Sequence, residues 1–226
     1  MRNLLICLIT LLPGLAAAQI PPKAAEVSRY TGLHAAAHRG DVADIERLIT
    51  AKADLNARDA YGRTPLHVAT HAGKVDAIRT LIKAGANHAL LENDRYDAVT
   101  IASVANNEDA LRMLLSLGVS AKLITSRYDG TALIASAHLG HAGVVKQLIA
   151  AGAPLDHVNN LHWTALIESI VLGDGGARHI ETLRALVSAG ASLQLADRNG
   201  NTPLKLAQGR SYKAMVQILE KAGAKP

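Results

Sequence analysis

The chain has 226 residues, of which 49% are hydrophobic and 3% aromatic, and its formal net charge is +5 at pH 7. This charge is small and scattered along the chain, so the composition gives no indication of nucleic-acid binding. The single cysteine, Cys7, lies in the N-terminal apolar segment, so the remainder can hold neither a disulfide framework nor a catalytic thiol.

Residues 1–18 have the layout of a secretory signal peptide. Arg2 precedes an apolar run over residues 4–12 that only Thr10 interrupts, and three alanines follow at 16–18. The run is about half of the ~20 residues that span a bilayer. The pattern therefore predicts cleavage after Ala18, a periplasmic or secreted mature chain and no stable membrane insertion. Residues 19–28 are interpreted as a linker and partial N-terminal cap.

A repeat follows from residue 29 to the C-terminus. An aliphatic residue recurs at intervals of 33 or 34, with a last interval of 38, and a small residue follows it three positions later. These positions divide residues 29–226 into six units. The aliphatic residues are Leu33, Leu66, Val99, Leu133, Leu166 and Leu204.

One unit, GRTPLHVATHAGKVDAIRTLIKAGAN at 62–87, shows why each repeat should form two short helices. Thr64 can cap a first helix that has Pro65 at its first position. A second helix is predicted from about Val75, with apolar residues at helical spacing, and Gly85 permits the left-handed residue that ends it. Because such short helices are marginal alone, they must stack on their neighbours.

TPLHVATHAGKVDAIRTLIKAGAN resembles the ankyrin repeat closely, and NGNTPLKLA at 199–207 resembles its opening. The resemblance implies an all-α ankyrin-repeat solenoid of about six helix-turn-helix repeats with projecting hairpin loops. It also implies that His34 and His67 tie neighbouring loops together. Two units depart from the pattern and should be locally weaker: Lys52 replaces a helix-ending glycine, and YDAVTIASVANN, at 96–107, lacks the Thr-Pro.

Motifs for catalysis do not occur in the sequence. GxSxG, HExxH, GxxxxGK[ST] and CxxC are all missing. Since ankyrin proteins are typically binding modules, we expect a protein that is not an enzyme, requires no cofactor and binds another protein.

Five of the six aromatic residues fall at the loops and first-helix entrances. Such residues often anchor interfaces, so they predict a partner-binding edge. The alternative is that they pack loop on loop and stiffen the stack. The five are Tyr30, Tyr61, Tyr96, Tyr128 and Trp163.

His38, His71 and His138 share one register, which the resemblance places on the concave side. Units stacked about 10 Å apart would hold two of these rings too far apart for one zinc ion. The row predicts either a partner-binding surface whose charge rises as the pH falls toward 6, or ordinary solvated side chains.

Unit five contains Glu168 and a five-residue insertion placed within LGDGGARH. Asp174 opposes an anion there, so a phosphate-binding loop is disfavoured. Glu168 replaces an aliphatic residue and should be buried, with the amides of 172–176, Arg178 or His179 as predicted partners. Its expected role is to anchor the inserted loop; the alternative is a small recognition site formed by Glu168, Asp174 and His179. WTALIESIVLGDGGARH is similar to a unit of exported bacterial ankyrin proteins.

The sequence therefore favours a non-catalytic exported scaffold that binds a partner through its concave face and loop edge. Two alternatives remain: a ligand-, metal- or haem-associated stress-protection accessory protein, and an immunity or inhibitor protein against a periplasmic toxin or hydrolase.

Overall fold

The structure, a computed structural model, describes residues 21–225. The predicted signal peptide and its cleavage point after Ala18 lie outside the described residues. Within 21–225 no helix is both long and apolar enough to cross a membrane. The described chain is all-helical apart from one isolated β-bridge between Thr125 and Gly130.

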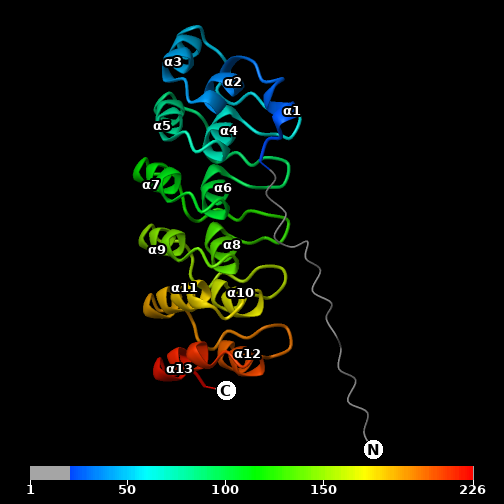
Figure 1. Cartoon of the computed structure of the whole chain (residues 1–226), viewed down its shortest axis with the longest axis vertical. Coiled ribbons are helices and arrows are strands. Elements are labelled where there is room, and N and C mark those ends of the chain that lie inside the picture. Colours follow the sequence, from blue (N-terminus) through cyan, green and yellow to red (C-terminus); the bar gives the residue numbers. More distant parts are fainter. Residues whose placement is uncertain (1–20, 226) are drawn as a thin grey trace, which may run out of the picture.

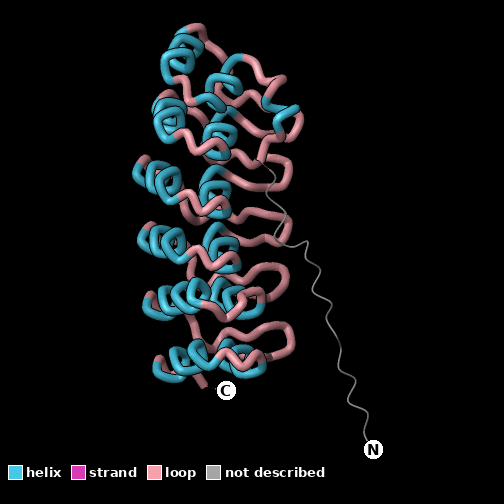
Figure 2. The backbone as a smooth tube through the Cα atoms, in the orientation of Figure 1, coloured by secondary structure: helices cyan, strands magenta, loops and turns pink. Residues whose placement is uncertain are grey.

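Six antiparallel helix pairs stack in sequence order, as predicted (Figure 1). The first helices of the pairs form an inner row and the second helices an outer row, and the loops between pairs project beside the inner row (Figure 2). A short helix, α1 (Ala24–Val27), precedes the first pair. The inner row comprises α2 (Gly32–Arg39), α4 (Pro65–His71), α6 (Ala98–Val104), α8 (Ala132–His138), α10 (Ala165–Val171) and α12 (Pro203–Gly209). The outer row comprises α3 (Val42–Thr50), α5 (Val75–Lys83), α7 (Glu108–Ser116), α9 (Ala142–Ala150), α11 (Ala177–Ser188) and α13 (Lys213–Lys221).

Local capping explains where the inner helices begin. The Thr64 hydroxyl accepts from the amide of His67 at the start of α4, and Pro65 occupies the first turn, as predicted. Unit three lacks this threonine, but Asp97 takes its place and accepts from the amide of Thr100. The first helix of unit three is therefore capped, although its sequence lacks the Thr-Pro pair.

Left-handed residues end the outer helices. Gly85 follows α5 with φ of 98°, and Lys52 follows α3 with φ of 61°. Lysine thus adopts the conformation that glycine supplies in the other units, although it does so against the steric preference of a side chain.

The core is a continuous aliphatic stack with small residues where inner helices meet. The recurring aliphatic residues are all buried. The small position is also fully buried; where it is serine, at Ser136 and Ser169, the hydroxyl donates to a carbonyl one turn earlier. Small residues permit close helix packing, so each unit buries its apolar faces only against its neighbours.

The insertion in unit five divides between a turn and a helix. The α10–α11 connection has five residues, 172–176, where the α4–α5 connection has three, 72–74. Helix α11 has 12 residues where α9 has 9, so the extra residues number (5 − 3) + (12 − 9) = 5. The five additional residues therefore lie within LGDGGARH, residues 172–179, as predicted. Only two of them lengthen the turn, and the other three extend α11 because Ala177, Arg178 and His179 are compatible with a helix.

Candidate functional site

The projecting loops are rigid turns rather than open connections. In the first, Asp59 Oδ1 accepts from the amides of Tyr61 and Arg63, each at 2.8 Å. The loop of unit five repeats this geometry with Asn159, whose Oδ1 accepts from the amides of Leu161 and Trp163, each at 3.0 Å. Satisfied turn amides hold each loop in a single conformation, so the loop edge is a preformed surface.

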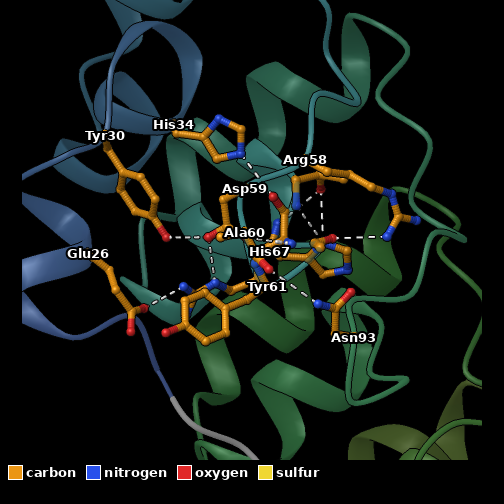
Figure 3. Close-up of polar contacts among 12 residues, drawn as sticks. Glu26, Tyr30, His34, Arg58, Asp59, Ala60, Tyr61, His67 and Asn93 are labelled. Carbon is orange, nitrogen blue, oxygen red and sulfur yellow. Dashed lines mark hydrogen bonds and ion pairs between the residues drawn. The ribbon is translucent and has the colours of Figure 1, made fainter.

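Neighbouring loops are also hydrogen-bonded to each other. Arg58 donates to the carbonyl of Leu91 at 2.9 Å, and the side-chain amide of Asn93 reaches the carbonyl of Ala60, as Figure 3 shows for the first two loops. The His34 ring contacts the carbonyl of Arg63 at 2.9 Å, and His67 contacts that of Leu90 at 3.0 Å. The predicted role of these two histidines in tying loops together is confirmed.

A buried ionic cluster joins α1 to the first loop (Figure 3). Arg63 is 2% exposed and pairs with Glu26 of α1 and with Asp59, and Tyr30 donates its hydroxyl to Asp59 at 2.8 Å. The hydrogen bond from Arg63 lowers the pKa of Glu26. Burial alone would raise the pKa of Asp59, but the hydrogen bonds that it accepts lower it. Burial and the bond to Asp59 raise the pKa of Tyr30. These groups hold the N-terminal segment to the stack.

The five predicted aromatic residues do not form one exposed row. Tyr61 is 47% exposed, with the Arg63 guanidinium 4.4 Å from its ring centroid. Tyr96 is only 7% exposed, and burial raises its pKa to about 12. Tyr30 is hydrogen-bonded to Asp59, while Tyr128 and Trp163 are half-buried. Tyr96 and Tyr30 therefore match the alternative of loop stiffening, and Tyr61 presents an accessible ring.

Two apolar residues that the sequence reasoning missed accompany Tyr61. Ile124 and Val158 are exposed on the loops of units four and five, at 49% and 43%. Each lies directly before the turn-forming segment of its loop, where an apolar side chain has no helix face to join. That position is the signal that could have identified them.

The histidines predicted to form a titrating surface, His38, His71 and His138, are not all exposed. Burial, with the charge of Arg63 in support, lowers the pKa of His71 to about 4. Burial and the neighbouring His179 lower the pKa of His138. The prediction that the row gains charge as the pH falls toward 6 is therefore wrong for these two. His38 lies beside Tyr30, with ring centroids 6.4 Å apart.

Glu168 is buried, as predicted, but none of its expected partners binds it. It is 5% exposed, and its Oε1 accepts from the side-chain amide of Asn159 at 2.8 Å. Its Oε2 lies 3.6 Å from Nδ1 of His138. Burial raises the pKa of Glu168 to about 8, although the Asn159 bond opposes the rise. The side chain thus belongs to the loop and inner row rather than to the insertion.

The insertion is held by other residues. His179 Nδ1 lies 2.7 Å from Asp174 Oδ1, and His179 Nε2 lies 2.9 Å from the carbonyl oxygen of His138. Tyr212 of the last unit donates its hydroxyl to the carbonyl of Gly173 at 2.9 Å. Asp174 and His179 therefore fasten the turn, and neither makes a hydrogen bond with Glu168.

Glu168 and His138 contribute to a cavity of about 70 Å³ between the inner row and the loops. We call it the Glu168 pocket. Helices α6, α8 and α10 and the loops of units three to five line it, and no lysine or arginine is among the lining residues. Its principal lining side chains are Tyr96, Tyr128, Ile134, His138, Leu161 and Glu168.

No group of three or more histidine, cysteine, aspartate or glutamate side chains within residues 21–225 is arranged to hold a metal ion.

The model of the family described as Ankyrin repeats (3 copies) matches residues 33–125, 101–197 and 133–226. The chain belongs to the ankyrin-repeat family. The ankyrin-repeat domain is a non-catalytic interaction fold that binds proteins, and the stack of helix pairs confirms the predicted all-α solenoid.

Solved ankyrin-repeat structures superimpose over most of the chain. An ankyrin-repeat domain from Acinetobacter baumannii is 42% identical with a TM-score of 0.80, over 85% of this chain and 98% of that one. A structure of the predatory endopeptidase Bd0816 from Bdellovibrio bacteriovorus in complex with immunity protein Bd3460 contains a chain that is 26% identical, with a TM-score of 0.70. The match covers 85% of this chain and 98% of that one.

Curated ankyrin-repeat proteins match shorter stretches. The putative ankyrin repeat protein YahD of Escherichia coli is 38% identical over 100 residues, which are 44% of this chain and 50% of YahD. A putative ankyrin repeat-containing protein of Treponema pallidum is 34% identical over 88 residues, which are 38% of this chain and 28% of that protein. The chain therefore matches half or less of the length of these relatives.

Proposed function

We propose that this ankyrin-repeat protein is an exported, non-catalytic scaffold that binds a partner protein through its inner row and loop edge. The Glu168 pocket carries the proposal, because it is a preformed recess between the inner row and the loops. Exposed Tyr61, Ile124 and Val158 add apolar contact area on the loops. A recess beside exposed apolar side chains suits an interface with a few anchors and a polar rim.

Site-specific photocrosslinking tests the surface. A photoreactive amino acid is placed at Tyr61, Ile124 or Val158. Matched controls carry it on the outer row at Arg79 of α5 or Arg112 of α7, whose side chains are 42% and 62% exposed. We expect one partner of defined mass to crosslink from the loop positions but not from the outer-row positions. Equal crosslinking from both faces, or none from the loops, would contradict the proposal.

Export rests on the first eighteen residues. The full chain with a C-terminal tag, expressed in a Gram-negative host, should be recovered from the periplasm or medium with Gln19 as its first residue. A variant with two charges in the apolar run, L5R/I9R, should stay unprocessed. A wild-type chain that retains residue 1 and remains in the cytoplasm would contradict export.

A second candidate is an immunity or inhibitor protein for an enzyme of the same compartment. The similarity to a chain in the endopeptidase–immunity complex favours this candidate. The purified chain should then inhibit an endopeptidase from its own source at stoichiometric concentration. Full peptidase activity with excess chain, across the endopeptidases of that organism, would exclude this candidate.

A further inference from the structure

Unit five is the only one of the six to place an ionisable side chain at the third residue of the recurring inner-helix pattern. Two residues after the recurring aliphatic position, the others carry Ala35, Val68, Ile101, Ala135 and Leu206. Glu168 is 5% exposed and lines the pocket. A buried carboxyl group is costly unless the structure compensates it, so this residue calls for a specific role.

Only one of the two oxygens of Glu168 is satisfied within the described chain. Oε1 is used by Asn159, whereas Oε2 has no hydrogen bond and has only Nδ1 of His138 nearby, at 3.6 Å. Because burial lowers the pKa of His138, that ring is neutral at pH 7 and supplies no charge. Oε2 therefore has no hydrogen-bond partner in the described chain and lies at the wall of a cavity, where it can accept a hydrogen bond once Glu168 is ionised.

The electrostatics of the pocket favour a cation. Its titratable lining groups are Tyr96, Tyr128, His138 and Glu168, and His179 lies behind His138. None is a lysine or arginine, so no fixed positive charge opposes an incoming cation. Tyrosine rings in the walls favour a cation over an anion as well.

The number of free acceptor atoms selects the kind of cation. Oε1 of Glu168 already accepts from Asn159, so the carboxyl group offers only Oε2 to a ligand. A single acceptor suits the ammonium group of a lysine, a compact charge, better than a planar guanidinium, which binds a carboxylate through both oxygens.

We propose that the Glu168 pocket receives a lysine side chain of the partner protein, whose ammonium group donates a hydrogen bond to Oε2 of Glu168. The apolar walls at Ile134 and Leu161 then cover the methylenes. This inference rests on the proposed function, since it names the anchor by which a partner would occupy the inner row.

Binding must release a proton. Glu168 is protonated when the pocket is empty at pH 7, because burial raises its pKa to about 8. The bound ammonium stabilises the carboxylate, so the proton leaves to solvent and the amine keeps its own. Affinity should therefore increase about tenfold from pH 6 to pH 7 and level off above pH 8.

The experiment uses n-butylammonium as a probe of the lysine tip, with the full mature chain labelled with ¹³C at glutamate carboxyl groups. At pH 7 we expect a saturable downfield shift of the Glu168 carboxyl resonance, with a dissociation constant of about 1–10 mM for so small a ligand. n-Butanol, which lacks the charge, should leave the resonance unchanged. An absent shift, or an equal response to n-butanol, would overturn the inference.

Two variants keep the result interpretable. E168Q retains the size of the side chain and removes the charge, so it should lose binding by ligand-observed NMR. A135M fills the pocket from α8 and should block the probe while the Glu168 resonance keeps its free position. Probe binding that persists in both variants would place the site elsewhere.

The butylammonium measurement needs no partner, so it tests the pocket even where photocrosslinking finds none. Conversely, a partner that crosslinks from the loops and binds E168Q as tightly as the wild type would overturn the lysine anchor while the proposed function stands.

Discussion

Asn159 and Glu168 are coupled through a buried hydrogen bond of 2.8 Å that links a projecting loop to the inner row. The same asparagine closes its own turn through Oδ1. In the loops of units two and six the corresponding residue is aspartate, at Asp59 and Asp197. An amide in unit five thus supplies the donor that a carboxylate could not.

Replacing Asn159 with aspartate should test this coupling. N159D keeps the turn acceptor but brings a second carboxyl group against Glu168. We expect the free energy of unfolding to fall by about 1–3 kcal/mol at pH 8 and by less at pH 6, where the two groups can share a proton. Urea denaturation at both pH values measures the loss, and N159D/E168Q should recover most of it. An equal loss at the two pH values would contradict the explanation.

The pH dependence of stability should have a maximum at about pH 6.5. The pKa of Glu168 is about 8 in the folded chain against an ordinary 4.5, so only the folded state keeps this proton between those values. Stability then falls as the pH rises, by about 1.4 kcal/mol per unit. His67 and His71 act oppositely: burial lowers each pKa to about 4 from 6.5, so the unfolded state gains protons first as the pH falls.

Below pH 6.5 the two histidines make the free energy of unfolding rise with pH more steeply than Glu168 makes it fall. Above pH 6.5 only Glu168 still changes it. Denaturation of E168Q should therefore show a flatter profile on the alkaline side, with about 2 kcal/mol less loss between pH 6.5 and 8. An alkaline limb unchanged in E168Q would mean that Glu168 titrates normally.

The Arg63 cluster should contribute more to the free energy of unfolding than an exposed ion pair does. R63M leaves Asp59 buried without its guanidinium partner and releases Glu26 of α1. We expect a loss of about 3 kcal/mol and faster hydrogen exchange over residues 24–30. The matched control R127M removes an exposed pair with Asp94 and should cost less than about 1 kcal/mol. Similar losses in the two variants would contradict the burial argument.

Lys52 offers a simple gain in stability. Its φ of 61° is the conformation that glycine adopts after the other outer helices, and its side chain is exposed. K52G should stabilise the chain by about 0.5–1 kcal/mol. The reverse change, G85A, should cost about 1 kcal/mol through φ alone, since no atom lies within 4 Å of the added Cβ. Thermal denaturation compares the two, and a destabilised K52G would show that Lys52 has a role beyond ending α3.

The helix starts could be predicted because each depends on residues close in sequence, and the repeats because their pattern recurs along the chain; the loop-tying role of His34 and His67 followed from the resemblance to the ankyrin repeat. Thr64 with Pro65 specifies a helix start wherever it occurs. The partners of Glu168 could not be predicted in this way, since the preceding loop folds back across α10 and brings Asn159 to it. Burial of Tyr96 likewise depends on the stacking of successive loops, and the helical part of the insertion depends on packing that extends α11.

The two edges of the stack differ in their tolerance to changes of length. Loop-to-loop hydrogen bonds such as Arg58–Leu91 and Asn160–Arg127, each spanning 33 residues, fix the spacing on one side. On the other side, the α10–α11 turn and the start of α11 together absorb five additional residues, while Arg198 still reaches the carbonyl of Asn160. Insertions and deletions among homologues should therefore accumulate at the helix–helix turns, where tags, labels or grafted peptides can also be inserted without disturbing the proposed binding face.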